Sequence, residues 1–326
     1  MTLKRHIQSE TDHPFGNVPI DKVGIVRIQK RVDIGKRYIF TPFISALIRL
    51  PGAQRGIHMS RTAETIEEVV NEVVILPANS VEEVCHRIAK SLLEYHEYTD
   101  YCEVKMRGDI IVPIQEGESK SAQRTYTIQS KVVGHRQVGG TAHYRVFVGT
   151  SAEGMTACPC AQEMNREYTE EIVKNRKEFN ISPEQLEKLF NVFPMASHNQ
   201  RAVGTVTIEV GDEQKNFIDI IDIIKVIEES MSAKIRDILK RPDEAELVRV
   251  AHLNPRFVED VVRSMTRRLA NDAAFAKIPD EFTVRCQVTS FESIHTYNAY
   301  AELKTTFGEI RKIFKEMTSP ESTHKN

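Results

Sequence analysis

The chain has 326 residues, and its 44 lysines and arginines nearly balance its 46 aspartates and glutamates. The net charge of −2 gives no overall field that would gather nucleic acid or an anionic membrane, so neither is expected as a partner. The first residues lack the apolar stretch of a signal peptide, and no apolar run approaches the roughly 20 residues that span a bilayer, which predicts a cytoplasmic protein.

The first half of the chain predicts a pair of helices between strands. Alternating or dense apolar residues indicate the strands, and apolar residues at helical spacing indicate the helices. The expected elements are strands at 23–28 and 38–50, helices at 62–74 and from the N-cap Ser80 onward, and strands at 104–114 and 124–133. Polar residues at 116–119 are expected to form the turn between the last two strands.

The second half repeats this order of elements. It predicts strands at 142–148 and 203–210, a helix at 218–229, a second helix opened by Pro255, and a strand at 282–291. Two strands, two helices and a return to strand therefore appear twice, which is interpreted as a repeated ββααββ order and predicts two contiguous modules, residues 1–138 and 139–326.

One segment does not fit the repeat. Residues 149–199 are far longer than a hairpin loop and carry helical patterns of their own, at 163–177 and 182–190. Long insertions are often functional, and this one has two cysteines near its start and a histidine near its end.

The two cysteines, Cys158 and Cys160, flank a single proline. One intervening residue, with no second cysteine pair, excludes a structural zinc ribbon. The spacing allows one thiolate ligand, with nitrogen and oxygen ligands supplied from distant segments, as in an open catalytic metal site. The alternative is that both cysteines are small packing residues.

Three further residues could complete such a site. His198 alone is as well explained by a hydrogen-bonded surface or core histidine. Glu292 and His295 can converge if the chain turns after the strand at 282–291, whereas in a continued strand they would face opposite sides. The sequence leaves both arrangements open.

Two charged segments have simple structural explanations. KRPDE at 240–244 places charges around a proline that is expected to end a helix, so these charges could form a solvated helix terminus. NPRFVED at 254–260 puts two acids in the first turns of a helix, where they favour the helix dipole whatever their function.

Taken together, six segments occur in the order found in one enzyme family. They are GIHMSR at 56–61, CPC at 158–160, HNQR at 198–201, KRPDE at 240–244, NPRFVED at 254–260 and ESIH at 292–295. The chain therefore resembles the type IB GTP cyclohydrolases, which are unrelated in sequence to the common zinc enzyme. The long segment between the CPC motif and His198 is similar to the archaeal branch, the MptA enzymes.

The resemblance implies an α+β fold of two tandem tunnelling-fold modules. Each module is a ββααββ unit whose antiparallel sheet carries helices on one face, and the sheets close into barrels when subunits associate. A homo-oligomer is therefore expected, as a dimer or a dimer-based tetramer, since symmetric association is the ordinary way to cover exposed sheet edges.

The resemblance also assigns roles to residues. Cys158 and His198 are expected metal ligands, with Glu244, Glu292 and His295 around the metal as ligands or catalytic partners. Fe(II) is the implied metal, with Zn(II) or Mn(II) in purified or crystallised protein; the ligand types alone do not choose among them. Glu259 resembles the carboxylate that holds the guanine edge. The triphosphate needs cations, and the candidates are His58, Arg61, Arg201, Lys240 and Arg241.

The implied reaction is attack of metal-activated water on C8 of GTP, loss of formate, and reclosure to 7,8-dihydroneopterin 2′,3′-cyclic phosphate for methanopterin synthesis. Glu292 or His295 would move protons at N7 and N9, and Cys158 completes the expected catalytic set. The alternatives are the same ring opening with the triphosphate retained, a tunnelling-fold nitrile reductase, and a non-enzymatic scaffold whose Cys158 and Cys160 respond to oxidation.

Overall fold

The computed structural model describes residues 8, 16–34, 38–75, 78, 80–116, 120–137, 139–176, 178–211 and 218–318. Residues 117–119 of the expected turn, and all but two of the first sixteen residues, lie outside these ranges. The fold is α+β, with antiparallel strand pairs and helices, as expected.

The chain divides into two compact units, each discontinuous in sequence. The first unit comprises residues 1–112, 125–150 and 207–218, and the second comprises 113–124, 151–206 and 219–326. The sequence instead predicts two modules that are each continuous in sequence, residues 1–138 and 139–326, and this division of the chain stays a prediction. Four long strands each contribute a segment to both units: β5 (Tyr101–Glu116), β6 (Lys120–Arg136), β7 (Ala142–Ala157) and β8 (Asn199–Glu209).

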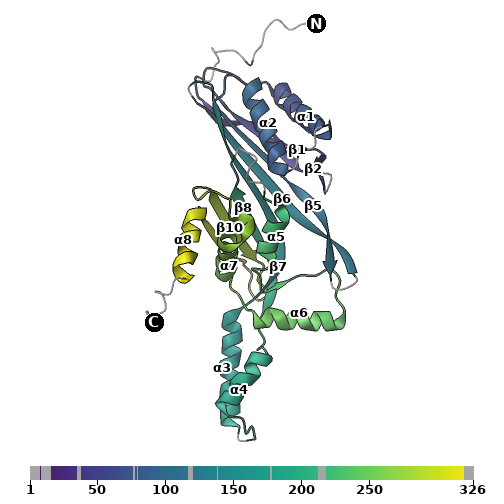
Figure 1. Cartoon of the computed structure of the whole chain (residues 1–326), viewed down its shortest axis with the longest axis vertical. Helices are drawn as coiled ribbons and strands as arrows, with labels where there is room; N and C mark the ends of the chain where they lie inside the picture. The colour runs from purple at the N-terminus through teal and green to yellow at the C-terminus, as the bar shows by residue number, and fades with distance from the viewer. Residues whose placement is uncertain are drawn as a thin grey trace. The chain divides into compact units, whose positions relative to one another are not determined.

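The first unit is a sheet with two helices. Its strands lie in the order β1-β4-β5-β6-β7-β8, where β1 is Ile20–Gln29 and β4 is Phe43–Leu50. A separate small sheet pairs β2 (Val32–Ile34) with β3 (Tyr38–Phe40). The helices α1 (Met59–Ile75) and α2 (Val81–Tyr95) lie side by side along this unit's strands (Figure 1).

Alternation along the strands explains why the helices cover one face. In β4 the buried residues are Ile44, Ala46, Ile48 and Leu50, and the residues between them are more exposed. On α2 the predicted apolar stripe is buried, and the predicted N-cap Ser80 accepts a hydrogen bond from the Glu83 N–H. Each fully buried Leu or Ile contributes about 1.5–3 kcal/mol, so this contact surface accounts for much of the unit's stability.

The second unit contains the remaining helices. They are α3 (Pro159–Asn175), α4 (Pro183–Val192), α5 (Ile220–Glu228), α6 (Arg241–Leu253), α7 (Val258–Asn271), the short 3₁₀ helix η3 (Ala273–Phe275) and α8 (Phe307–Thr318). Its strands lie in the order β7-β8-β10-β11, with β10 at Thr283–Ser290 and β11 at Ala299–Thr306, and the short β9 (Ala233–Lys234) pairs with β7.

Glycines let α5 and the turn after it approach the sheet of this unit. A Cβ at Gly204 of β8 would lie 2.6 Å from Ile227 Cγ2, and one at Gly154 of β7 would lie 2.3 Å from Met231 Cγ. Both positions therefore need a residue without a side chain. The second helix against the sheet is α7, whose stripe of Val261, Met265 and Leu269 is buried as predicted.

Several predicted boundaries are wrong. The helix expected from Pro255 begins at Val258, because the Asp260 carboxylate accepts from the Phe257 N–H and Phe257 becomes the exposed N-cap. Pro242 does not end a helix; it lies in the first turn of α6, where a missing N–H costs nothing. The strand β11 and the helix α8 were not predicted.

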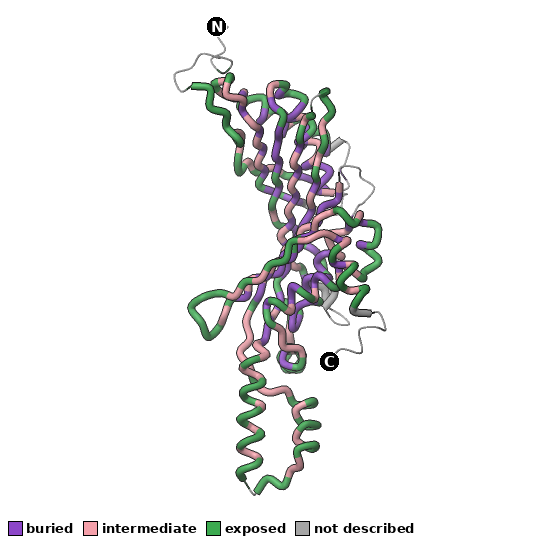
Figure 2. The backbone as a smooth tube through the Cα atoms, turned by 90° about the vertical axis from the view of Figure 1, so that its left-hand side faces the viewer, coloured by how far each residue is buried: buried purple, intermediate pink, exposed green. Residues whose placement is uncertain are grey.

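The predicted insertion is shorter than its expected range, because β7 continues to Ala157. What remains is mainly the helical hairpin α3 and α4, neither of which has a buried residue. Figure 2 shows this hairpin in exposed and intermediate colours throughout. Among the described residues, no helix combines the length and apolarity needed to cross a bilayer.

Candidate functional site

Four predicted site residues lie on three neighbouring segments of the second unit, next to the ends of three strands. Cys158 follows the last residue of β7, His198 precedes β8, and Glu292 and His295 follow β10. Backbone bonds tie these segments together: the Cys158 N–H donates to the His198 carbonyl at 3.0 Å, and the Phe291 N–H donates to the Arg201 carbonyl at 2.9 Å. Thr156 and Ser290 are 134 positions apart in the sequence, and their hydroxyl oxygens also lie 3.0 Å apart. Together these contacts hold the three segments next to one another.

His198 is the centre of this group. Its Nδ1 lies 3.8 Å from Glu292 Oε2, and the two side chains are 13% and 10% exposed. The His198 and His295 ring centroids are 6.4 Å apart with their planes nearly perpendicular. His295 is exposed and stacks on Tyr297, with centroids 4.8 Å apart. The chain does bend after β10, which is the condition for Glu292 and His295 to lie near the same partner.

Cys158 is held by its backbone at the start of α3. It is the N-cap of that helix, and its carbonyl accepts from Ser197 Oγ at 2.6 Å. The thiol is half-buried, whereas Cys160 is exposed. A helix N-terminus favours a negative charge, so a thiolate at Cys158 is in a suitable place. Cys158 is therefore better placed than Cys160 to act as a ligand.

Sequence reasoning missed Gln200. Its Oε1 is 3.0 Å from His198 Nδ1, and its Nε2 is 3.1 Å from Glu292 Oε1 and 3.2 Å from the hydroxyls of Thr156 and Ser290. The signal was present in the HNQR motif, because residues two apart in a strand face the same side. Gln200 links His198 and Glu292, two largely buried members of the cluster.

The cluster has the donor types of a mixed metal site. A thiol, imidazoles and a carboxylate suit Fe(II) or Zn(II), and the Gln200 contact at Nδ1 leaves Nε2 of His198 available. Within the described ranges, however, no three His, Cys, Asp or Glu side chains are grouped so that they could hold an ion. The residues fit a metal by their chemistry and their support, and the ligand set stays a prediction.

Glu244 lies at the opposite end of α6 from His252, the residue of that helix that contacts the segment before β8. It is exposed on the first turn of α6, and its backbone N–H donates to the Lys240 carbonyl. The other end of the helix does reach the cluster, since His252 Nε2 lies 3.1 Å from the Ser197 carbonyl. Eight residues of helix separate Glu244 from His252, which is about 12 Å along the axis. Lys240 and Arg241 are exposed beside Glu244.

Glu259 is exposed on the first turn of α7. The segment before this helix is anchored next to Cys158, because the Arg256 N–H donates to the Ala157 carbonyl at 3.0 Å. The Arg256 guanidinium also donates to the Ser230 carbonyl at 2.7 Å. These bonds fix the start of α7 beside the cluster and leave the Glu259 carboxylate facing solvent.

Arg201 is on the opposite face of β8 from Gln200. Its side chain is 69% exposed and forms an ion pair of 3.2 Å with Glu153, which is itself half exposed. Exposed pairs of this kind contribute about 0–1 kcal/mol, so a phosphate could displace Glu153 at little cost.

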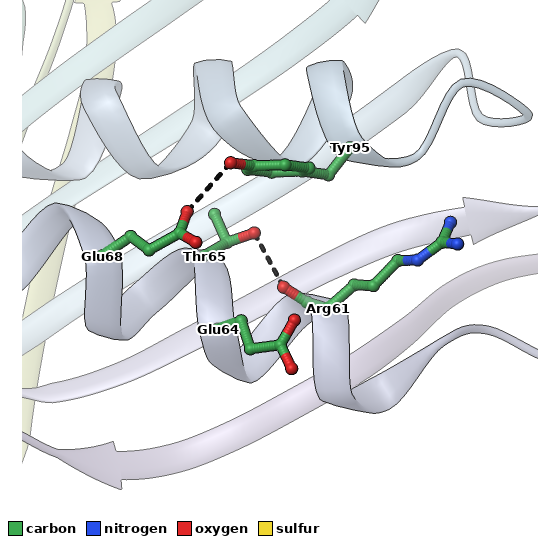
Figure 3. A pocket seen from close by; sticks show the side chains of 5 residues that line it. All are labelled: Arg61, Glu64, Thr65, Glu68 and Tyr95. Carbon is green, nitrogen blue, oxygen red and sulfur yellow. Dashed lines mark hydrogen bonds between the residues drawn. The ribbon is translucent and has the colours of Figure 1, made fainter.

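His58 and Arg61 lie in the first unit, at the start of α1. Arg61 lines a shallow hollow with Glu64, Thr65, Glu68 and Tyr95, and Figure 3 shows its guanidinium extending away from the bond between Tyr95 and Glu68. Two carboxylates in this hollow disfavour a polyphosphate there. Burial, together with the positive charge of Arg61, lowers the pKa of the nearby His96 to about 4.

Comparison with known proteins gives one consistent family. Residues 5–301 match the family model described as type I GTP cyclohydrolase folE2. The chain is 37% identical to GTP cyclohydrolase MptA of Methanoculleus marisnigri over 302 residues, covering 91% of this chain and 94% of that protein. It is 35% identical to GTP cyclohydrolase MptA of Methanosphaera stadtmanae, covering 97% of this chain and 100% of that one.

Solved structures with this fold include uricases. The uricase from Bacillus fastidious superposes with a TM-score of 0.55 at 7% identity, covering 94% of this chain and 99% of the uricase. The uricase from Arthrobacter globiformis gives 0.50 at 6% identity, covering 88% and 93%. At such low identity these likenesses establish a shared fold.

Proposed function

The chain belongs to the type I GTP cyclohydrolase (folE2) family and is a GTP cyclohydrolase, and we propose that it converts GTP to formate and 7,8-dihydroneopterin 2′,3′-cyclic phosphate, a precursor of methanopterin. The observation that carries the location of the chemistry is the cluster of Cys158, His198, Glu292 and His295, which three separate segments supply.

The proposed cofactor is a divalent metal ion held by Cys158 and His198, with Glu292, His295 and Glu244 as further candidate ligands. Fe(II) is the proposed native metal, and Zn(II) or Mn(II) could replace it in purified protein. When bound, the ion would supply Lewis-acid activation of water for attack on C8 of guanine. The half-buried thiol of Cys158 and the His198 ring, whose Nδ1 faces Gln200 Oε1 at 3.0 Å, support this assignment.

The remaining steps need proton transfers at the guanine nitrogens N7 and N9. Glu292 and His295 are the proposed acid and base, because both lie next to His198 and differ in exposure. Glu292 is held by Gln200 and largely buried, whereas His295 is exposed and able to exchange protons with solvent. Such a pair suits one proton transfer within the site and one proton exchange with solvent.

Glu259 is the proposed partner of the guanine edge. A carboxylate accepts two parallel hydrogen bonds from the ring N1–H and the 2-amino group, and adenine lacks this pair of donors. The triphosphate is proposed to contact cations among His58, Arg61, Arg201, Lys240 and Arg241. Of these, Arg201, Lys240 and Arg241 are exposed in the same unit as the cluster.

We place the chain in the cytoplasm as a homo-oligomer, a dimer or a dimer-based tetramer, in which two tandem tunnelling-fold modules per subunit close into barrels. The strand orders in the two units support this, because each ends on a strand with one neighbour: β1 in the first unit and β11 in the second. Unpaired edges of this kind are ordinarily covered by another strand or subunit.

Mass spectrometry of the product tests the proposed reaction. Protein loaded anaerobically with Fe(II) is incubated with GTP, and the expected products are formate, pyrophosphate and the cyclic phosphate. Appearance of 7,8-dihydroneopterin triphosphate without pyrophosphate would contradict the proposed product while leaving the ring opening intact.

A further inference from the structure

Gln200 makes polar side-chain contacts with five other residues around the cluster. Its carboxamide reaches His198, Glu292, Thr156 and Ser290, each at 3.0–3.2 Å, and Ser293 Oγ lies 3.5 Å from its oxygen. These partners come from β7, the start of β8, and the end of β10 with the segment that follows it. One side chain therefore joins all three segments that build the cluster.

The orientation of the carboxamide follows from its partners. Gln200 Nε2 lies 3.1 Å from Glu292 Oε1 and 3.2 Å from the hydroxyl oxygens of Thr156 and Ser290, so the NH₂ group, which only donates, faces three oxygens that can accept. The reverse orientation would place the amide oxygen against a carboxylate oxygen. Gln200 Oε1 therefore faces His198 Nδ1 at 3.0 Å.

This orientation fixes the proton on His198. An amide oxygen only accepts, so Nδ1 must carry the hydrogen. In a neutral imidazole the other nitrogen, Nε2, then has the free lone pair that a metal ion needs. Histidine ligands in metalloproteins are commonly set in this way, by a partner that accepts from the nitrogen away from the metal.

We propose that Gln200 is a positioning residue that holds His198 in the tautomer with hydrogen on Nδ1, while its NH₂ group holds the Glu292 carboxylate beside the same ring. The tautomer follows from contacts within the chain, and only its purpose, presenting Nε2 to a metal ion, rests on the proposed function. Gln200 itself contacts neither metal nor substrate in this role.

The test is nuclear magnetic resonance of the full-length, metal-free protein with ¹⁵N-labelled histidine at pH 8. Two-bond proton–nitrogen correlations distinguish the two neutral tautomers, and the His198 signal is identified by its loss in His198→Gln. The wild type should show hydrogen on Nδ1. Gln200→Met, which keeps the length but removes both polar groups, should shift the ring to a mixture or to hydrogen on Nε2.

Gln162→Met is the matched control. Gln162 donates to the Met195 and His252 carbonyls, so it supports the same region without touching the His198 ring. This variant should keep the wild-type tautomer even if it lowers stability. Co(II) alone, followed by its visible absorption, should bind about 10–100-fold more weakly to Gln200→Met than to the wild type, as is typical when an outer partner of a ligand is lost.

A wild-type ring with hydrogen on Nε2, or an unchanged tautomer in Gln200→Met, would overturn the assignment. So would the same shift in Gln162→Met, since it would show a general loosening of the region. If the tautomer behaves as expected but the wild type binds no Co(II) and releases no formate from GTP, the proposed function fails and the role of Gln200 in setting the ring stands.

Discussion

Cys158 and Cys160 are separated by one proline but have different surroundings. Replacing either sulfur by an oxygen, as a Cys→Ser substitution does, therefore tests which of the two thiols matters. Cys158 is half-buried at the N-terminus of α3 with its backbone bonded to His198 and Ser197, whereas Cys160 is exposed. We assign the ligand role to Cys158 and no role to Cys160.

Cys158→Ser should therefore abolish turnover and weaken metal binding by more than the roughly 100-fold that loss of an outer partner costs. Cys160→Ser should keep measurable activity. Metal affinity and formate release are measured on both, and thermal unfolding of the metal-free proteins should be similar. Wild-type turnover by the Cys158 variant would remove it from the site.

A second residue-scale feature is the buried carboxyl of Glu82 in α2. Burial raises the pKa of Glu82 from 4.5 to about 7. The folded state therefore keeps a proton between pH 4.5 and 7 that the unfolded state has lost. The free energy of unfolding falls as the pH rises through this window, by roughly 3 kcal/mol in total.

The Glu82→Gln variant has no carboxyl group to ionise at this position, so it does not lose stability in this window. Its free energy of unfolding minus that of the wild type should therefore be roughly 3 kcal/mol larger at pH 8 than at pH 4.5. Urea unfolding at the two pH values measures it. Glu83→Gln is the control: that carboxylate is paired with Arg87, and this variant should be no more stable than wild type at pH 8. A Glu82→Gln variant that gains nothing at pH 8 would contradict the buried, protonated carboxyl.

At the scale of elements, close packing of α5 on β8 depends on Gly204. A Cβ there would meet Ile227 Cγ2 at 2.6 Å and Met231 Cε at 3.0 Å. Gly204→Ala should therefore lower the free energy of unfolding by about 1–3 kcal/mol, the usual cost of overpacking. Denaturant unfolding of the metal-free protein measures it.

Gly56→Ala is the comparison, because the nearest atom to its Cβ would be 3.9 Å away. Adding Ile227→Val to Gly204→Ala should recover part of the loss. Equal stabilities of the two single variants would show that the helix can shift without cost.

The sequence predicted elements well where apolar periodicity was strong and poorly where tertiary contacts set the limits. The stripe on α2 and its cap Ser80 were predicted correctly because both are local signals. The strand β11 was missed because most of its residues are polar or exposed, so it lacks an apolar pattern. Its antiparallel pairing with β10 stabilises it instead. Pro242 was misread because a proline indicates a helix boundary without saying which end.

The same distinction holds for the site. Cys158, His198, Glu292 and His295 could be named from motifs, but their assembly depends on backbone bonds between β7, β8 and β10 that no local pattern reveals. Gln200 was missed although its position two residues after His198 was visible, because a neutral amide becomes informative only when its partners are known.

At the scale of the whole molecule, Glu244 and Glu259 lie on the exposed first turns of α6 and α7, which leaves both carboxylates accessible to a second subunit and suits a site completed by association. A homo-oligomer is expected by scattering or ultracentrifugation at assay concentrations. Mixing inactive Cys158→Ser and Glu259→Gln subunits should restore part of the activity. In a mixed oligomer, a site that takes Cys158 from one subunit and Glu259 from the other can contain both wild-type residues. A fully active monomer would contradict the shared-site arrangement.

The central claim is that metal held at the Cys158 and His198 cluster opens the guanine ring. Its most direct test is release of labelled formate from GTP carrying ¹³C at C8, measured anaerobically on chelator-treated protein before and after metal is returned. The account predicts no formate without metal, recovery with Fe(II), no recovery with Mg(II) alone, and no recovery with Fe(II) in His198→Gln. Formate released at the same rate by the metal-free protein, or by the His198 variant, would contradict it.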